Sequence, residues 1–140
     1  HFISAFGEHV IGEEVEACML KAAKEENVYV TEFTVAPFVS NDQGKSYHEW
    51  YVEFENKPDD MQRFASRLDQ YLREKNVYYD DLIGGNILSP LKINTVRKNG
   101  FIDYMKSIGK LGGQNKVPRL SNDRKIADEL IKWTENLQEA

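Results

Sequence analysis

The sequence predicts one α/β (α+β) domain with a ferredoxin-like sheet. The chain has 140 residues, 41% of them hydrophobic, which is enough to bury a single core. Two segments show the 3.6-residue period of amphipathic helices, and others are rich in β-branched and aromatic residues, as strands are. The predicted order β-α-β-β-α-β is typical of a split βαβ unit, with two helices packed on one face of the sheet. Additional helices follow towards the C-terminus.

The first half of the chain supplies the elements of this order up to the hairpin. Residues 2–5 form a short predicted strand, and residues 11–26 form a predicted helix, because apolar side chains recur on one face. Residues 28–38 and 47–55 are predicted strands, joined as an antiparallel hairpin by the turn-forming segment 40–44. Along the second strand one face carries four side chains: His48, Trp50, Val52 and Phe54.

The second half contains a helix opened by Pro58 and ended by Asn76, then a loop over residues 77–89 and a strand over residues 91–96. We expect a short helix at residues 101–107 and a glycine-rich basic loop at 109–119. A final helix is predicted over residues 122–137, with Ser121 as its N-cap.

Composition excludes several classes of function. The formal net charge is −5, whereas binding to nucleic acid or to an anionic membrane needs a basic surface. No apolar run approaches the ~20 residues of a membrane span, and no signal segment opens the chain. Cys18 is the only cysteine, so an internal disulfide is impossible and a reducing cytoplasmic location is the simplest inference.

A search for a self-contained active site finds little. The sequence contains no Walker loop, no paired metal-ligand motif and no nucleophile elbow, so no metal ligands are assigned. His48 lies on the apolar face of a strand, where a hydrogen-bonded core histidine is preferred over a catalytic base. Cys18 fits a buried helix position. The pair Asp80 and Asp81 is interpreted as solvated rather than as a cation site.

The segment from Lys110 to Arg119 is the exception. It places three cations and two amide side chains among glycines. Lysine offers a compact charge to a phosphoryl or carboxylate oxygen, and arginine offers a fork of donors to the same oxygens. The segment is therefore either a loop that reaches a neighbouring phosphate site or an ordinary solvated loop.

Two stretches carry a resemblance to known enzymes. Gly7-Glu-His-Val-Ile-Gly-Glu-Glu-Val-Glu16 resembles the stretch that follows the hinge in the acyl-adenylate-forming superfamily of luciferases and acyl-CoA synthetases, with Gly12 where proline is usual. Residues 90–96, Gly100-Phe101 and Gln114-Asn-Lys-Val-Pro-Arg119 are similar to the C-terminal pattern of the auxin-responsive (Gretchen Hagen 3) acyl-acid amido synthetases. Gly113 and Asn115 depart from the plant pattern and indicate a bacterial-type member.

The resemblance implies that residues 1–140 are a mobile C-terminal cap of a longer ligase, inactive in isolation. Such enzymes activate a carboxylic acid with ATP and Mg²⁺, held mainly by the N-terminal adenylation domain, and then transfer the acyl group to an amino acid. The cap rotates between the two half-reactions. By this analogy Lys116 is the catalytic lysine. Further contacts to nucleotide or substrate are assigned by the same analogy to Gln114, Arg119, Glu8 and His9.

Two alternatives stay open. The domain is also compatible with the cap of an acyl-CoA ligase, which has the same architecture but a thiol acceptor. It is also compatible with a free-standing ferredoxin-like module that binds a small effector or a partner. The identities of the acid and the amine are not readable, because specificity pockets lie mainly outside these residues.

Overall fold

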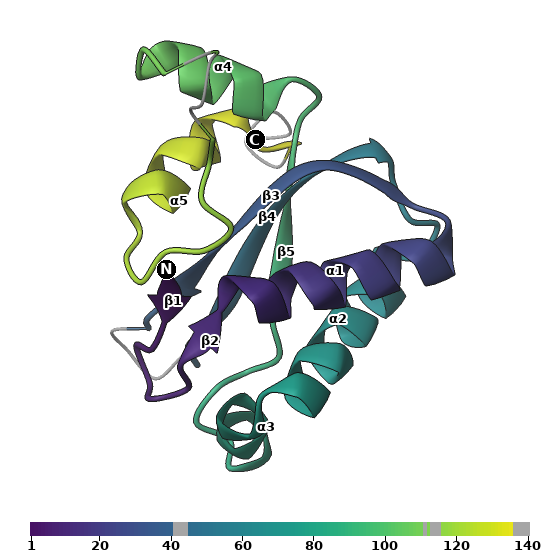
Figure 1. Cartoon of the computed structure of the whole chain (residues 1–140), viewed down its shortest axis with the longest axis vertical. Coiled ribbons are helices and arrows are strands. Elements are labelled where there is room, and N and C mark those ends of the chain that lie inside the picture. The colour runs from purple at the N-terminus through teal and green to yellow at the C-terminus, as the bar shows by residue number, and fades with distance from the viewer. Residues whose placement is uncertain (41–44, 111, 113–115, 136–140) are drawn as a thin grey trace.

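A computed structural model of the chain describes residues 1–40, 45–110, 112 and 116–135. It is a mixed α/β structure, as predicted, with its elements arranged around a central sheet (Figure 1). In chain order the elements are β1 (Phe2–Ile3), β2 (Val10–Ile11), α1 (Gly12–Glu26), β3 (Tyr29–Phe38), β4 (Tyr47–Asn56), α2 (Met61–Lys75), α3 (Val77–Gly84), β5 (Lys92–Val96), α4 (Gly100–Ser107), α5 (Lys125–Leu130) and a 3-10 turn, η1 (Ile131–Trp133).

The central sheet has three strands in the order β3-β4-β5. Strands β3 and β4 form the predicted antiparallel hairpin, with Val35 opposite Trp50, and the turn at residues 41–44 lies outside the described residues. Strand β5 returns through α2 and pairs parallel to β4, with Ile93 opposite Trp50. The parallel pairing needs a crossover connection, which α2 provides.

The first predicted strand pairs elsewhere. Strand β1 forms a separate two-stranded antiparallel sheet with β2, in which Phe2 lies opposite Ile11. Because β4 pairs directly with β3 and β5, the central sheet has no internal position left for β1. The side chains of Ile3 and Val10 still reach the main core, where both are fully buried.

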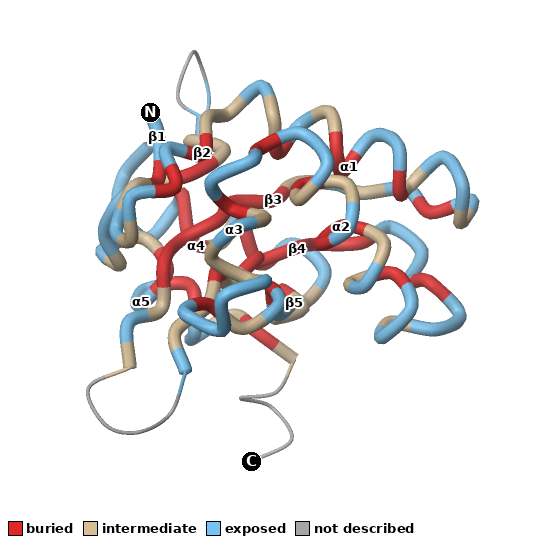
Figure 2. Tube along the Cα trace, turned by 90° about the horizontal axis from the view of Figure 1, so that it is seen from below, coloured by how far each residue is buried: buried red, intermediate tan, exposed pale blue. Residues whose placement is uncertain are grey.

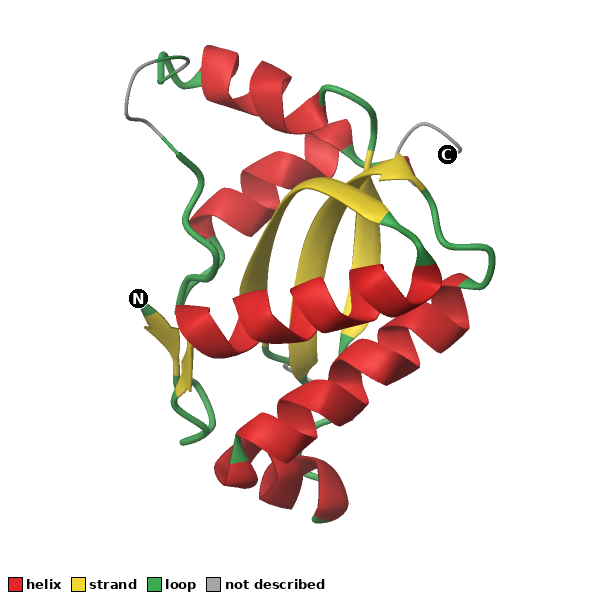
Figure 3. Ribbon diagram, turned by 45° about the vertical axis from the view of Figure 1, so that its right-hand side comes forward, coloured by secondary structure: helices red, strands yellow, loops and turns green. Residues whose placement is uncertain are grey.

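Helices cover both faces of the central sheet. The predicted pair, α1 and α2, packs on one face over a core that includes Trp50 and Phe64 (Figure 3). Helices α4 and α5 cover the other face over a second cluster that includes Tyr51 and Leu130. The central parts of β3 and β4 are consequently buried between the two helical layers (Figure 2). Among the described residues no helix is both long and apolar enough to cross a membrane.

Further predicted segments differ from the structure. The helix predicted to open at Pro58, α2, begins at Met61, and Asp60 caps it by accepting from the amide of Arg63 at 3.0 Å. The predicted loop at residues 77–89 begins with helix α3, whose first turn is capped by the side chain of Asn76 accepting from the amide of Tyr79 at 2.8 Å. Only Tyr79 of this helix is buried, so no apolar stripe reveals it.

Ser121 does not cap the last helix, because the N-cap position is Arg124, while the Ser121 amide donates to the carbonyl of Val35 at 3.0 Å. That helix, α5, spans only Lys125–Leu130 of the predicted 122–137, because η1 follows it and Thr134 is extended and bridged to Val96.

Candidate functional site

A short extended segment beside the outer edge of β3 carries the predicted catalytic lysine at its start. The amide of Val35 donates to the carbonyl of Arg119 at 2.9 Å, and the amide of Ser121 donates to the carbonyl of Val35 at 3.0 Å. The pairing is parallel, with Val35 opposite Leu120. We call residues 116–121 the edge segment. Since β4 occupies the other side of β3, the edge segment covers the side that would otherwise be free.

Buried side chains fasten the edge segment to both faces of the sheet. Leu120 is fully buried in the main core under α1 and α2, and Val117 is 7% exposed in the cluster under α4 and α5. The hydroxyl of Thr34 donates to the carbonyl of Pro118 at 2.6 Å. The segment therefore has a fixed position from residue 117 onwards.

Arg119 is committed to contacts within the domain. Its Nε lies 3.1 Å from Oε1 of Glu16 on α1, and its Nη1 donates to the carboxylate of Glu32 on β3. The same Nη1 donates to the carbonyl of Phe33 at 3.1 Å, and the guanidinium lies 4.6 Å from the centre of the Phe33 ring. These contacts hold Arg119 against α1 and β3, and its predicted contact with nucleotide or substrate stays a prediction.

Lys116 differs from the residues that follow it, because its side chain is exposed. It borders two adjoining hollows of about 260 and 290 Å³, and Lys110 borders both as well. One of them is also lined by the carboxylate-bearing residues Glu32 and Glu53. Among the residues that the structure describes, no ion pair of Lys116 is found.

Glu53 has a structural role beside this lysine. It is 3% exposed, and its two carboxylate oxygens accept from the amides of Asn99 at 3.0 Å and Phe101 at 3.1 Å. These amides belong to the start of α4, where a carboxylate satisfies free N–H groups and complements the helix dipole. The hollow bordered by Lys116 thus has a fixed wall. Gln114 lies outside the described residues.

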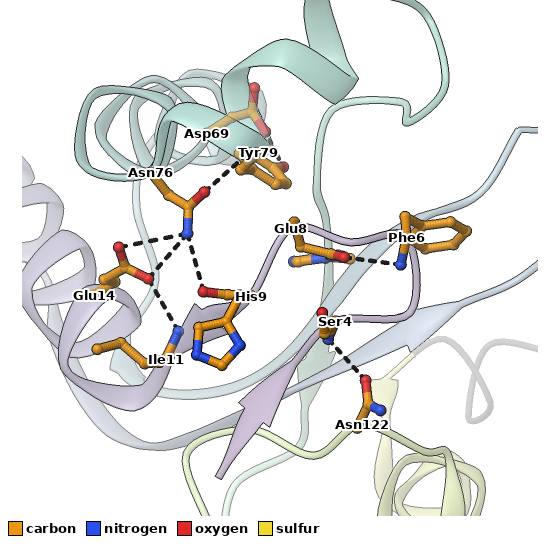
Figure 4. Close-up of polar contacts among 11 residues, drawn as sticks. Ser4, Phe6, Glu8, His9, Ile11, Glu14, Asp69, Asn76, Tyr79 and Asn122 are labelled. Atoms are coloured by element: carbon orange, nitrogen blue, oxygen red, sulfur yellow. Dashed lines mark hydrogen bonds and ion pairs between the residues drawn. The ribbon is translucent and has the colours of Figure 1, made fainter.

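The two remaining predicted site residues face in opposite ways. Glu8 is fully buried, and its Oε2 lies 2.6 Å from Nε2 of His48, which is also fully buried. Its Oε1 accepts from the amide of Phe6 at 2.8 Å (Figure 4). His9 is exposed, with its ring 5.0 Å from that of Phe2. In this structure the Glu8 carboxylate is thus enclosed, and His9 alone of the two faces solvent.

The Glu8 carboxylate is ionised at neutral pH. Burial by itself raises its pKa, but the hydrogen bond from His48, backbone hydrogen bonds and the attraction of His48 together hold the pKa below its ordinary value. Because a carboxylate only accepts, Nε2 of His48 carries the hydrogen. The interpretation of His48 as a hydrogen-bonded core histidine agrees with this geometry.

The turn that carries Glu8 and His9 is joined to the edge segment through one contact. The side chain of Asn122, directly after that segment, accepts from the amide of Ser4 at 2.8 Å (Figure 4). The β1–β2 hairpin therefore lies beside the C-terminal end of the edge segment. The residues that the sequence interpretation missed are Glu32 and Asn122, for which no local motif gives a signal.

Two other candidates from the sequence have structural roles. Burial raises the pKa of the Cys18 thiol to about 11, which suits an inert core position. Asp80 is paired with Arg73, whose Nε lies 2.5 Å from its Oδ1. Within the described ranges no group of three or more acidic, histidine or cysteine side chains is placed to hold a metal ion.

An open groove of about 820 Å³ lies between α1 and β3. Its lining is mainly apolar, from residues such as Met19, Leu20 and Val30, and Arg119 lies among the lining residues. Lys116 does not line it. The exposed lysine and the groove are therefore separate features of the surface.

The region as a whole defines a class: an α/β domain that presents one exposed lysine from a segment anchored at a sheet edge. A protein-family model described as the GH3 family C-terminal domain matches residues 13–125. The chain belongs to the GH3 family. This confirms the resemblance found in the sequence, and no curated protein matches the chain.

Solved structures support the same fold. The structure of GH3.15 acyl acid amido synthetase is similar with a TM-score of 0.74 at 16% identity, over 96% of this chain and 25% of that one. A second structure, AtGH3.15 acyl acid amido synthetase in complex with 2,4-DB, has a TM-score of 0.71 at 15% identity, over 95% of this chain and 25% of that one. The chain thus spans a quarter of the length of these relatives.

Proposed function

We propose that this chain is the cap domain of an ATP-dependent ligase that conjugates a carboxylic acid to an amino acid. Membership in the GH3 family and the fold shared with acyl acid amido synthetases support the proposal. The observation that carries it is the position of Lys116 at the start of the edge segment. Its side chain is exposed, whereas the residues directly after it are anchored to the sheet.

The proposed role of Lys116 lies in the first half-reaction. There, a carboxylate oxygen of the acid attacks the α-phosphorus of ATP, an acyl adenylate forms and pyrophosphate leaves. Negative charge shifts on the phosphate oxygens as the bonds exchange, and an ammonium group beside them lowers the barrier. In the second half-reaction the amine attacks the acyl carbon and AMP leaves, which does not require the same cation.

We further propose that residues 1–140 act together with an N-terminal adenylation domain. The chain covers only a quarter of its structural relatives, and its described residues hold no metal-binding group, so ATP and Mg²⁺ are assigned mainly to that domain. The cap brings Lys116 to the bound acid and ATP for adenylation and withdraws it for transfer. Family membership favours an amine as acceptor over a thiol.

The test is Lys116→Ala in the full-length enzyme. Acid-dependent pyrophosphate exchange should fall by about 10²–10³-fold, the usual effect of removing one group aimed at developing charge. Amide formation from preformed acyl adenylate should stay close to wild type. The fold should be unaffected, because an exposed loop lysine contributes little to stability.

Lys110→Ala is the matched control. Lys110 borders the same two hollows as Lys116 but lies outside the Gln-x-Lys-x-Pro-Arg motif. Pyrophosphate exchange in this variant should remain near the wild-type rate. Equal effects of the two substitutions, or a defect of Lys116→Ala confined to transfer, would refute the assignment.

A further inference from the structure

We propose that Glu16 and Glu32 are positioning residues, which act through Arg119 to fix the point where the chain carrying Lys116 leaves the sheet edge. The proposal rests on the function proposed above and extends it to residues that never touch substrate. Its basis is the geometry of Arg119 and of the part of β3, around Phe33, with which the edge segment does not pair.

Arg119 is held from several directions at once. Glu16 contacts it from α1, Glu32 contacts it from β3, and the ring and carbonyl of Phe33 contact its face and its Nη1. The guanidinium is a rigid plane with donors in fixed directions, so these contacts define both its position and its orientation. A single exposed ion pair would not do this, because its two long side chains stay flexible.

The same side chains end the pairing between the edge segment and β3. In a parallel ladder Val35 bonds on both sides of Leu120, so the next position, Phe33, would bond on both sides of Pro118. Instead, the amide of Phe33 donates to Glu32 at 3.0 Å, and its carbonyl accepts from Nη1 of Arg119 at 3.1 Å. The amide of Phe33 is therefore used by a side chain instead of the ladder, and its carbonyl is already bonded to Arg119.

Two consequences follow for Lys116. It is three residues before a fixed arginine, so its backbone begins from a defined place whenever the cap approaches the active site. It is also kept off the β3 edge, since Glu32 and Arg119 occupy the bonding groups that would draw the chain into the ladder. Loss of either carboxylate removes one of the contacts that orient the guanidinium, so the point where the chain carrying Lys116 leaves the sheet edge is less well defined.

The test uses Glu32→Gln and Glu16→Gln in the full-length enzyme. Both substitutions keep the size of the side chain and remove its charge. Pyrophosphate exchange should fall by about 10- to 100-fold for Glu32→Gln, because small misplacements of a reacting group have effects of this size. The exchange rate should fall less for Glu16→Gln, since the side chain of Glu16 is 58% exposed. Amide formation from preformed acyl adenylate should change by less than about 2-fold in both variants.

Matched controls are Glu13→Gln on α1 and Glu55→Gln on β4. Both residues are exposed, and neither has an ion pair with a described residue. Thermal unfolding of each variant checks the fold, and Glu16→Gln keeps the test valid even if Glu32→Gln is poorly folded. Exchange rates of Glu32→Gln and Glu16→Gln equal to those of the controls overturn the proposal.

A double substitution separates positioning from general structural damage. If Glu32 acts through Lys116, adding Glu32→Gln to Lys116→Ala should cause no further loss of exchange. If the loss in the double variant is the product of the two single losses, or if Glu32→Gln slows adenylation and transfer equally, Glu32 has a merely structural role and the proposal is overturned. If Lys116→Ala itself leaves exchange unchanged, the proposed function fails first. If Lys116→Ala lowers exchange but Glu16→Gln and Glu32→Gln do not, only the positioning inference fails.

Discussion

The buried pair of Glu8 and His48 shows how much a single side chain contributes to the stability of this domain. Both side chains have no exposure, and Nε2 of His48 lies 2.6 Å from the Glu8 carboxylate. The ring of His48 packs 5.1 Å from that of Tyr79, whose hydroxyl donates to Asp69 at 2.6 Å. Removing one member of a buried pair leaves the other without compensation, and this is more costly than losing an exposed ion pair.

Glu8→Ala should therefore lower the free energy of unfolding by about 1–3 kcal/mol, the cost of leaving a buried donor without its acceptor. Glu8→Gln should cost less, because the amide oxygen still accepts from the backbone of Phe6 and the NH2 group can donate to Nε2 of His48 once the ring hydrogen moves to Nδ1. Urea unfolding at neutral pH measures both. Equal losses for the two variants would show that burial and packing dominate over the hydrogen bonds.

The same pair predicts a pH dependence. The folded-state pKa of Glu8 lies below its ordinary value of 4.5, so its contribution is fully present above that pH and is lost as the pH falls through the lower folded value. In Glu8→Gln this part of the acid destabilisation should be absent. Unfolding free energies of the two proteins measured below about pH 5 test this, and parallel curves would contradict it.

At the scale of elements, the start of α4 is packed too closely to accept a larger residue than glycine. A Cβ on Gly100 would collide with the side chain of Val96 at the end of β5 and approach the carbonyl oxygen of Trp133 to 3.1 Å. Backbone bonds explain the close packing, because Arg97 donates to Trp133 at 2.8 Å and Gly100 donates to Arg97 at 2.8 Å. The second core therefore depends on this glycine.

Gly100→Ala should lower the free energy of unfolding by about 1–3 kcal/mol, the usual cost of overpacking, although alanine favours helices. Gly12→Ala is the control, since Gly12 starts α1 and a Cβ there meets nothing within 4 Å. That substitution should be neutral or stabilising by up to about 1 kcal/mol. Chemical denaturation of the two variants measures these changes in the free energy of unfolding. Similar effects at both positions would argue against the proposed clash.

For the whole molecule, the question is whether two cores behave as one. The main core lies under α1 and α2, and the second lies under α4 and α5, with β4 contributing alternate side chains to each. Val117 and Leu120 of the edge segment also belong to different clusters. Shared strands of this kind couple the two layers, so unfolding of either layer exposes the other.

Because the two layers are coupled, the isolated chain should unfold in a single cooperative transition. As the cap of a longer ligase, it should also show no acid-dependent release of pyrophosphate from ATP. The two tryptophans test cooperativity, because Trp50 lies in the main core and Trp133 packs against the second. Trp50→Phe and Trp133→Phe leave one fluorescent probe in each cluster. Within each variant, the fluorescence midpoint in urea should coincide with that of far-UV circular dichroism. Separate midpoints, or pyrophosphate release by the chain alone, would contradict the prediction.

Much of this protein follows from local pattern. Period-two alternation assigned the side chains of β4 to their faces, and 3.6-residue periodicity located α1 and α2, because both patterns reflect burial on one side of an element. The family resemblance selected Lys116 and Arg119 from a segment that composition alone would leave as a loop. Helix α3 could not be found this way, since Tyr79 is its one buried residue.

Other features depend on residues far apart in the chain. No pattern around Glu8 indicates His48, and none around Arg119 indicates Glu16 and Glu32, because each partner belongs to a different element. The pairing of β1 with β2 instead of the central sheet depends on which edges the other strands leave open. The sequence alone thus determined α1, α2, the β3–β4 hairpin and β5, with their buried faces, and the resemblance selected Lys116. Only the tertiary structure decided which charges meet and where the edge segment ends, because those contacts join residues that local periodicity cannot relate.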